Sequence, residues 1–279
     1  TSAVLGKKEK SFGEPRELSE HGDARIISVV NQKGGVGKTT STINLGAALA
    51  ELGRRVLLVD FDPQHSLSVG LGVSTRHLDG SIYNLMMDES TSIQNFLLKT
   101  SVPNMDMIPS HENLAASEGG LMNVIAREKV LKRVLEPVRK DYDVILIDCQ
   151  PTMGQLAINA LVASDEVIVP LQCEWFSLHG FIELNNNLNK VRQALNPDLK
   201  LSGILATMYD RRAVHNREVL ARIVEQFPED TFETIIAKTI RFSESSVKGE
   251  PIIQYAQNSG AANAYRRLAR ELIARGGAK

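Results

Sequence analysis

The chain has few cysteines, few aromatic residues and no long apolar run. Two cysteines among 279 residues cannot form a disulfide framework or, within one chain, a four-cysteine metal site. We therefore expect Cys149 and Cys173 to be small buried hydrophobic side chains. No apolar run approaches the roughly 20 residues of a transmembrane helix, and the start of the sequence lacks an apolar secretory stretch. These absences predict a cytoplasmic protein without stable membrane insertion.

Net charge is also nearly absent, because 32 Lys and Arg face 33 Asp and Glu. This balance excludes a uniformly basic nucleic-acid coat and an acidic disordered protein. The balance is uneven along the chain, since residues 211–279 carry twelve basic and eight acidic side chains. The C-terminal part is therefore the part expected to meet a polyanion.

The pattern of apolar residues divides the chain at residue 25. Residues 1–24 show no periodicity and predict a flexible N-terminal tail, whereas residues 25–279 predict a single domain. In that domain, short aliphatic runs alternate with segments of helical spacing, which is typical of a parallel sheet wrapped by helices. The expected strands are 26–30, 56–60, 105–108, 144–148, 167–170, 201–207 and 234–236. The expected helices are 38–52, 127–139, 155–163, 178–195, 215–227 and 261–274, with loops at 72–79 and 111–120.

A glycine-rich segment, V-V-N-Q-K-G-G-V-G-K-T-T at 29–40, ends one expected strand and begins a helix. A phosphate is favoured there, because glycine amides can point inward and the helix N-terminus is electropositive. The usual phosphate-loop pattern requires glycine at Gln32, so this is a deviant form with a second lysine, Lys33. The predicted phosphate-binding residues are Lys33, Gly34, Gly35, Val36, Gly37, Lys38, Thr39 and Thr40.

Acidic side chains end two further expected strands. Asp60 and Asp62 follow one aliphatic run, and Asp148 ends another. An aliphatic strand that ends in Asp is typical of a Walker B element, which holds Mg²⁺ directly or through water. Thr39, Asp62 and Asp148 are the predicted metal-binding residues, with Asp62 also the candidate that orients the attacking water.

Five ordered segments resemble the ParA/Soj branch of the ParA–MinD deviant Walker A ATPases. They are N-Q-K-G-G-V-G-K-T-T (31–40), V-L-L-V-D-F-D-P-Q (56–64), I-L-I-D-C-Q-P (145–151), I-V-P-L-Q-C-E (168–174) and T-M-Y-D (207–210). The resemblance implies an α/β, doubly wound, mostly parallel sheet that binds ATP or ADP with Mg²⁺. It also implies an ATP-state homodimer in which Lys33 crosses to the partner's phosphates. Lys33, Lys38 and Asp62 are then the catalytic residues of a slow ATPase, which a ParB-like protein is expected to stimulate.

The resemblance further implies that the ATP dimer binds DNA without sequence preference and associates with the nucleoid. Arg212 and Arg241 match the DNA-binding arginines of the family. The chain departs from the usual family sequence in two places, with Gln150 after the Walker B cysteine and with Ala237, Lys238, Thr239, Ser245 and Ser246 around Arg241. These departures resemble actinobacterial paralogues associated with cell division, so chromosome partition and division-site positioning both stay open.

Other interpretations share the deviant loop. A MinD-like ATPase would act through protein or membrane partners, and a nucleotide-dependent scaffold would have vestigial hydrolysis. An iron–sulfur carrier would need paired cysteines across a dimer, which Cys149 and Cys173 do not supply as a motif.

Overall fold

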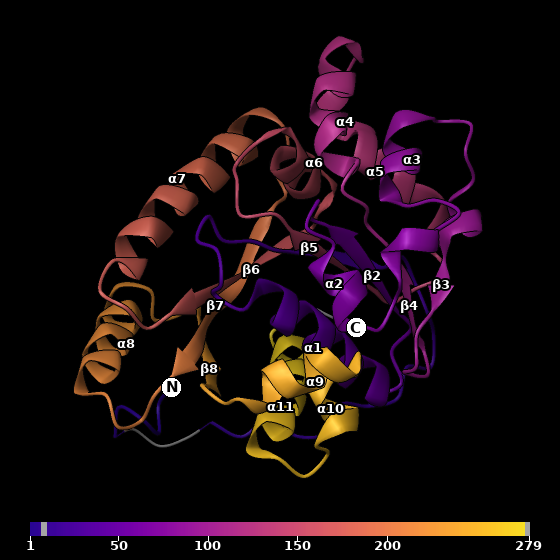
Figure 1. Cartoon of the computed structure of the whole chain (residues 1–279). Helices are drawn as coiled ribbons and strands as arrows, with labels where there is room; N and C mark the ends of the chain where they lie inside the picture. Colours follow the sequence, from indigo (N-terminus) through magenta and orange to yellow (C-terminus); the bar gives the residue numbers. More distant parts are fainter. Residues whose placement is uncertain (7–9, 277–279) are drawn as a thin grey trace.

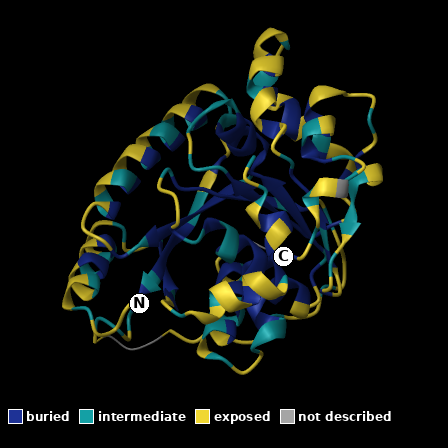
Figure 2. Cartoon of the chain, viewed as in Figure 1, coloured by how far each residue is buried: buried dark blue, intermediate teal, exposed yellow. Residues whose placement is uncertain are grey.

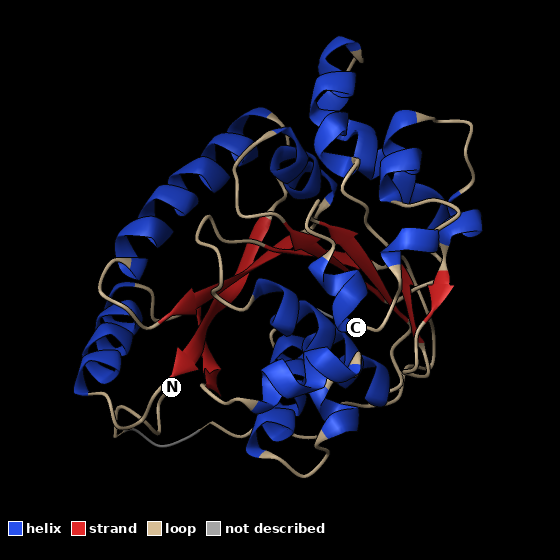
Figure 3. Ribbon diagram, viewed as in Figure 1, coloured by secondary structure: helices blue, strands red, loops and turns tan. Residues whose placement is uncertain are grey.

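The computed structural model describes residues 1–6 and 10–276, and its centre is one sheet (Figure 1, Figure 3). Within these residues the sheet has eight strands in the order β3-β4-β2-β5-β1-β6-β7-β8. All neighbouring strands are parallel except β3, which runs antiparallel to β4 at one edge. The strands are β1 (Arg25–Val29), β2 (Val56–Phe61), β3 (Leu98–Lys99), β4 (Met105–Ile108), β5 (Val144–Cys149), β6 (Glu166–Gln172), β7 (Lys200–Tyr209) and β8 (Thr231–Ala237).

Helices cover both faces of this sheet and enclose a separate hydrophobic cluster on each face (Figure 2). One face carries α1 (Lys38–Glu51), α2 (Ser66–Gly70), α9 (Arg241–Lys248), α10 (Ile252–Tyr255) and α11 (Gly260–Ala274). The other face carries α3 (Ile82–Met87), α4 (Leu114–Gly120), α5 (Val130–Leu135), α6 (Gln155–Ala163), α7 (Ser177–Ala194) and α8 (Val214–Gln226). This arrangement confirms the predicted doubly wound α/β fold.

The central strands explain why the sheet is parallel. Every residue of β2 and β5 is buried, and both strands are nearly continuous aliphatic runs. Such runs suit a sheet whose two faces are both covered, whereas a half-exposed strand alternates polar and apolar residues. The two strands pair in register from Val56 and Val144 to Phe61 and Cys149, so their acidic ends meet at one edge.

Each expected strand is present, with ends that shift by up to three residues. The loop expected at 111–120 is wrong, because α4 occupies Leu114–Gly120. The expected helix 127–139 is broken into a 3₁₀ turn (Arg127–Lys129), α5 and a second 3₁₀ turn (Glu136–Val138). Pro137 accounts for the second break, because proline cannot donate the backbone hydrogen bond that continues an α-helix.

The N-terminal segment, which the sequence predicts to be a flexible tail, makes several polar contacts with the rest of the chain. Arg54 Nη2 donates to the Arg16 carbonyl at 3.1 Å, and His21 Nδ1 lies 2.6 Å from Asp143 Oδ1. Glu14 pairs with Arg270 on α11. These contacts are made by polar side chains and backbone groups, so a pattern of apolar residues in the sequence could not predict them. The expectation for residues 7–9 and 277–279 lies outside the described residues.

In the described ranges, no helix is long and apolar enough to cross a membrane.

A buried carboxylate fastens α11 to β8. Glu271 is fully buried and accepts hydrogen bonds from the Glu233 and Thr234 amides at 2.7 and 2.9 Å and from Thr234 Oγ1 at 2.8 Å. Arg275 pairs with the same carboxylate at 2.8 Å. These two amides of β8 therefore have a partner, although among the described residues no further strand pairs with this edge of the sheet.

We expect Glu271→Ala to lower the free energy of unfolding by about 2–5 kcal/mol, because two buried amides lose their acceptor. Chemical denaturation monitored by circular dichroism measures this loss. Glu225→Ala, an exposed helical position on α8, is the matched control and should change stability by less than about 0.5 kcal/mol. Equal stability of the two variants would contradict a fastening role for Glu271.

Candidate active site

The glycine-rich loop connects β1 to α1 and is tied to two neighbouring strands. Asn31 Nδ2 donates to the Pro170 carbonyl of β6 at 2.7 Å, and Asn31 Oδ1 accepts from the Lys33 amide at 2.9 Å. Thr207 Oγ1 of β7 donates to the carbonyl of Val36, which is itself buried, at 2.8 Å. The loop is thus held in one conformation.

Glycine is required at specific points of this loop. Gly35 and Gly37 have φ angles of 72° and 89°, in the left-handed region that favours glycine. A Cβ atom added to Gly34 would meet nothing within 4 Å, so the loop faces open space there. Backbone amides can therefore approach a ligand at this end of the sheet without intervening side chains.

Lys38 begins α1 and is buried to 94%, with a relative exposure of only 6%. Its Nζ donates to the Lys33 carbonyl at 3.3 Å across the loop. Burial lowers the pKa of Lys38, while the nearby carboxylates of Asp148 and Asp62 oppose that shift. A buried cation at a helix N-terminus favours an anion, and phosphate meets that requirement.

Thr39 and Asp148 form the oxygen-rich part of the site. Thr39 Oγ1 donates to Asp148 Oδ2 at 2.7 Å, and Thr42 Oγ1 lies 3.5 Å from Asp148 Oδ1. Burial raises the pKa of Asp148 to about 8, and the neighbouring Asp60 adds to the shift. Hydroxyl and carboxylate oxygens are ligands of the kind that Mg²⁺ prefers, so Thr39 and Asp148 fit the predicted metal.

Asp60 is a site residue that the sequence prediction did not include. It stands opposite Asp148 in the pairing of β2 with β5 and is completely buried. The Ser68 amide and hydroxyl donate to it at 2.8 and 2.7 Å, and burial raises its pKa to about 6. The D-x-D pattern at 60–62 could have indicated this residue, because it places both carboxylates at the same end of β2.

Asp62 lies just beyond the end of β2, with a relative exposure of 9%. Its Oδ1 accepts a hydrogen bond from the Gln64 amide at 2.9 Å. Its charge helps to raise the pKa of Asp148 and opposes the lowering of the pKa of Lys38. The structure therefore places Asp62 close enough to both residues for electrostatic interaction.

The loop borders a hollow of about 260 Å³ beside α1. Gly37, Thr40 and Thr207 line it together with Lys238 and Thr239. The segment that departs from the usual family sequence thus forms a wall next to the phosphate loop.

Lys33 is separated from the buried cluster. Its side chain is 47% exposed, and its Nζ lies 2.5 Å from Glu174 Oε2 and 3.5 Å from Gln172 Oε1. Glu174 ends the segment 168–174, which resembles the ParA/Soj sequences, but it was not among the predicted site residues.

Arg212 and Arg241 are both exposed, but they do not line the same depression. Arg241, at the start of α9, lines a hollow of about 480 Å³ together with Arg211 and Arg267. The Arg212 amide donates to Asp210 Oδ1 at 2.9 Å in the turn after β7. Arg211 therefore lines the same hollow as Arg241, although it was not among the residues predicted to bind DNA.

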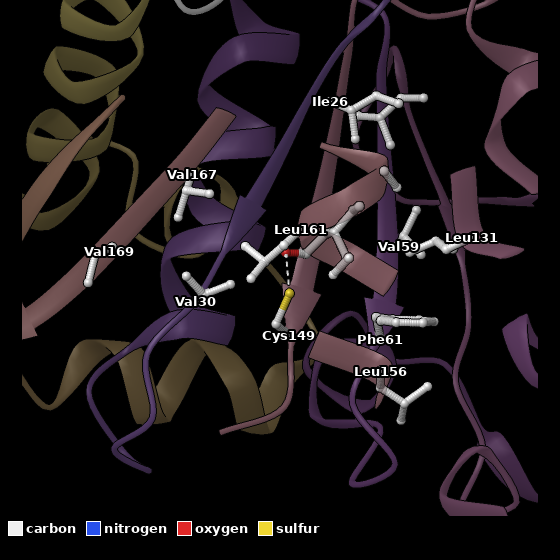
Figure 4. Packing of buried hydrophobic residues seen from close by; sticks show 14 of the residues in the cluster. Ile26, Val30, Val59, Phe61, Leu131, Cys149, Leu156, Leu161, Val167 and Val169 are labelled. Carbon is white, nitrogen blue, oxygen red and sulfur yellow. Dashed lines mark hydrogen bonds between the residues drawn. The ribbon is translucent and has the colours of Figure 1, made fainter. Parts of the chain in front are cut away.

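Both cysteines are buried and free, which confirms the prediction that they are small core residues. Figure 4 shows Cys149 among Val30, Leu161 and Leu156, with its Sγ 3.7 Å from the Ile147 carbonyl. Burial raises the pKa of both thiols, to about 12 for Cys173. Neither thiol is placed to act as a nucleophile.

Comparison with known proteins agrees with this geometry. A family model described as an AAA domain matches residues 24–201. The chain is 53% identical to an uncharacterised protein of Mycobacterium tuberculosis over 98% of this chain and 86% of that protein. It is 43% identical to the sporulation initiation inhibitor protein Soj of Bacillus subtilis over 90% of this chain and 99% of Soj. It is also 43% identical to the chromosome partitioning protein ParA of Myxococcus xanthus over 90% of this chain and 88% of that protein.

Two solved structures extend the comparison to bound nucleotide. One is named cobyrinic acid a,c-diamide synthase from Mycobacterium smegmatis with bound ADP and magnesium; it is 38% identical, with a TM-score of 0.75, over 90% of this chain and 94% of that one. The other is the cell division ATPase MinD of Pyrococcus furiosus, which is 26% identical with a TM-score of 0.75, over 90% of this chain and 99% of that one.

Proposed function

The chain belongs to the ParA/Soj family of deviant Walker A ATPases, and from this premise we propose that it is a Mg²⁺-dependent ATPase that dimerises with ATP and then binds DNA. The observation that supports this most is the loop between β1 and α1. It places a buried Lys38 beside Thr39 and Asp148, and it leaves Lys33 exposed at the surface. One lysine can therefore serve the chain's own nucleotide while the other can reach a partner's.

In this proposal, Lys38 and the loop amides bind the β- and γ-phosphates of ATP. Thr39 and Asp148 hold the Mg²⁺, which when bound neutralises charge on the phosphates. Asp62 orients the attacking water from the end of β2. The described geometry supports this division of roles, because the three carboxylate and hydroxyl groups and Lys38 converge on one end of the sheet.

Dimer formation is the step that we assign to Lys33. Its side chain is about half-exposed. Lys33 directly precedes Gly34, where the loop backbone faces open space. A second copy can therefore approach this side of the loop closely, and a cation supplied across the interface would stabilise phosphate charge in the manner of an arginine finger.

We expect Lys33→Ala to bind nucleotide but to form no dimer with a non-hydrolysable ATP analogue and Mg²⁺. Sedimentation velocity measures the dimer, and binding of a fluorescent nucleotide measures the affinity of the monomer. Lys190→Ala, an exposed lysine on α7, is the matched control and should dimerise like the unaltered chain. If Lys33→Ala formed dimers at the same protein concentrations as the unaltered chain, Lys33 could not be the residue that crosses to the partner's phosphates.

DNA is the partner that we propose for the ATP dimer. Arg241 shares a basic depression with Arg211 and Arg267, and Arg212 is exposed in the turn after β7. Each protomer contributes these arginines, so dimerisation doubles the contacts with DNA phosphates. Two of the relatives are named chromosome partitioning protein ParA. We propose that this chain likewise positions the chromosome, that it acts in the cytoplasm on the nucleoid, and that a ParB-like partner stimulates its ATP hydrolysis.

A further inference from the structure

We propose that Glu174 holds Lys33 within its own protomer and thereby competes with the partner's ATP, so that the turn after β6 sets the protein concentration at which the dimer forms. This inference rests on the proposed function, because it concerns the same lysine. Glu174 is a positioning residue in this proposal, since it acts through Lys33.

The contact itself is the first observation. Lys33 Nζ lies 2.5 Å from Glu174 Oε2, and Gln172 Oε1 lies 3.5 Å from the same ammonium. The two acceptors flank the lysine from the end of β6, the strand that pairs with β1 immediately before the loop. Lys33 therefore points back toward its own sheet in the monomer instead of outward.

The backbones on both sides of this contact are fixed. The Lys33 amide is held by Asn31, whose side chain is bound in turn to Pro170 of β6. On the other side, Cys173 is completely buried and its carbonyl accepts Asn216 Nδ2 at 2.8 Å. The Glu174 carbonyl accepts the Ser177 amide at 3.0 Å at the start of α7. Rotation of the two side chains is thus the motion that breaks the contact.

The pair is well placed to exchange partners. Both side chains are about half-exposed, at 47% and 48%, so water screens their attraction and the pair contributes little to stability. A triphosphate offers several negative charges, whereas Glu174 offers one, so ATP of a second copy can displace the carboxylate. The monomer keeps Lys33 with Glu174, and the dimer transfers it to phosphate.

The neighbouring residue supplies a direct reporter. Trp175 is the one tryptophan of the sequence and is 52% exposed next to Glu174. Its ring lies 4.4 Å from the Arg222 guanidinium carbon and 6.3 Å from the His215 ring, which fixes its position over α8. When Lys33 leaves Glu174 and a second copy of the chain approaches, the fluorescence emission of Trp175 should change.

The test compares Glu174→Gln with the unaltered chain in a non-hydrolysable ATP analogue and Mg²⁺. Removing the competing charge in both protomers should lower the dimer dissociation constant about 2- to 30-fold, as expected for two exposed ion pairs. Sedimentation equilibrium measures the constant, and Trp175 emission should follow the same concentration dependence. The difference in dissociation constant between Glu174→Gln and the unaltered chain should become smaller in high salt, because salt screens exposed ion pairs. Glu174→Asp, which keeps the charge, should stay near the unaltered chain.

Two further variants make the result specific. Glu183→Gln removes an exposed charge from α7 that pairs with His179, and it should leave the dissociation constant unchanged. Adding Glu174→Gln to Lys33→Ala should restore no dimer, because the effect requires Lys33.

Unchanged or weaker dimerisation of Glu174→Gln would overturn the inference, and so would dimers of the Lys33→Ala/Glu174→Gln chain. Failure of the unaltered chain to dimerise would instead overturn the proposed function.

Discussion

Asp62→Ala should reduce ATP turnover by about 100- to 10,000-fold, which is the usual contribution of a residue that orients or deprotonates the attacking nucleophile. The carboxylate stands beyond the end of β2, near Lys38 and Asp148, but the neighbouring Asp60 and Ser68 hold the strand end in place without it. Nucleotide binding should therefore survive the substitution. The variant should accumulate as an ATP-bound dimer.

Phosphate release measures the turnover of this variant, and sedimentation velocity with ATP measures the accumulated dimer. Asp198→Ala, an exposed aspartate between α7 and β7, is the matched control and should turn over ATP normally. Normal turnover by Asp62→Ala would assign the water to another group, and loss of nucleotide binding would make Asp62 part of the nucleotide pocket instead.

Lys38→Ala should weaken ATP binding by about 10- to 150-fold, because hydrogen bonds to charged groups contribute about 1.5–3 kcal/mol. Lys38 is buried at the start of α1, and its Nζ spans the loop to the Lys33 carbonyl at 3.3 Å. Lys33, the other lysine of the loop, is exposed and lies against Glu174 outside this buried cluster. The buried Asp148 also loses the cation that offsets part of its pKa shift.

Isothermal titration with ATP and Mg²⁺ measures the loss of affinity. Lys132→Ala, an exposed lysine on α5, controls for the removal of one positive charge. Unchanged affinity of Lys38→Ala would show that the segment 29–40 does not bind phosphate.

The sequence predicted the strand ends and the loop well because their residue types have one physical use. The run 56–59 is too apolar to leave the core, so it fixes both the strand and the strand end at which Asp60 and Asp62 lie. The glycines of the loop predicted a close approach of backbone amides to phosphate, and the positive φ angles of Gly35 and Gly37 give a further reason for glycine at these positions.

Other features depend on contacts between distant segments and left weaker signals. Glu174 reads as an ordinary surface glutamate until the pairing of β6 with β1 brings it to Lys33. Glu271 reads as an exposed helical residue until α11 lies against the edge of β8. Helix α4 was missed because Gly119 and Gly120 lie at its end and the segment is too short for a clear helical period.

The central claim is that ATP converts this chain into a dimer that binds DNA without sequence preference. Retention of Asp62→Ala on non-specific duplex DNA, with ATP and with ADP at two salt concentrations, tests it most directly. The same chain with Arg212→Ala and Arg241→Ala added is the control. Four phosphate contacts per dimer would give a salt slope of about −3.6 on logarithmic axes. The account predicts ATP-dependent, salt-sensitive retention that the double substitution abolishes, and absence of retention in both nucleotide states would contradict it.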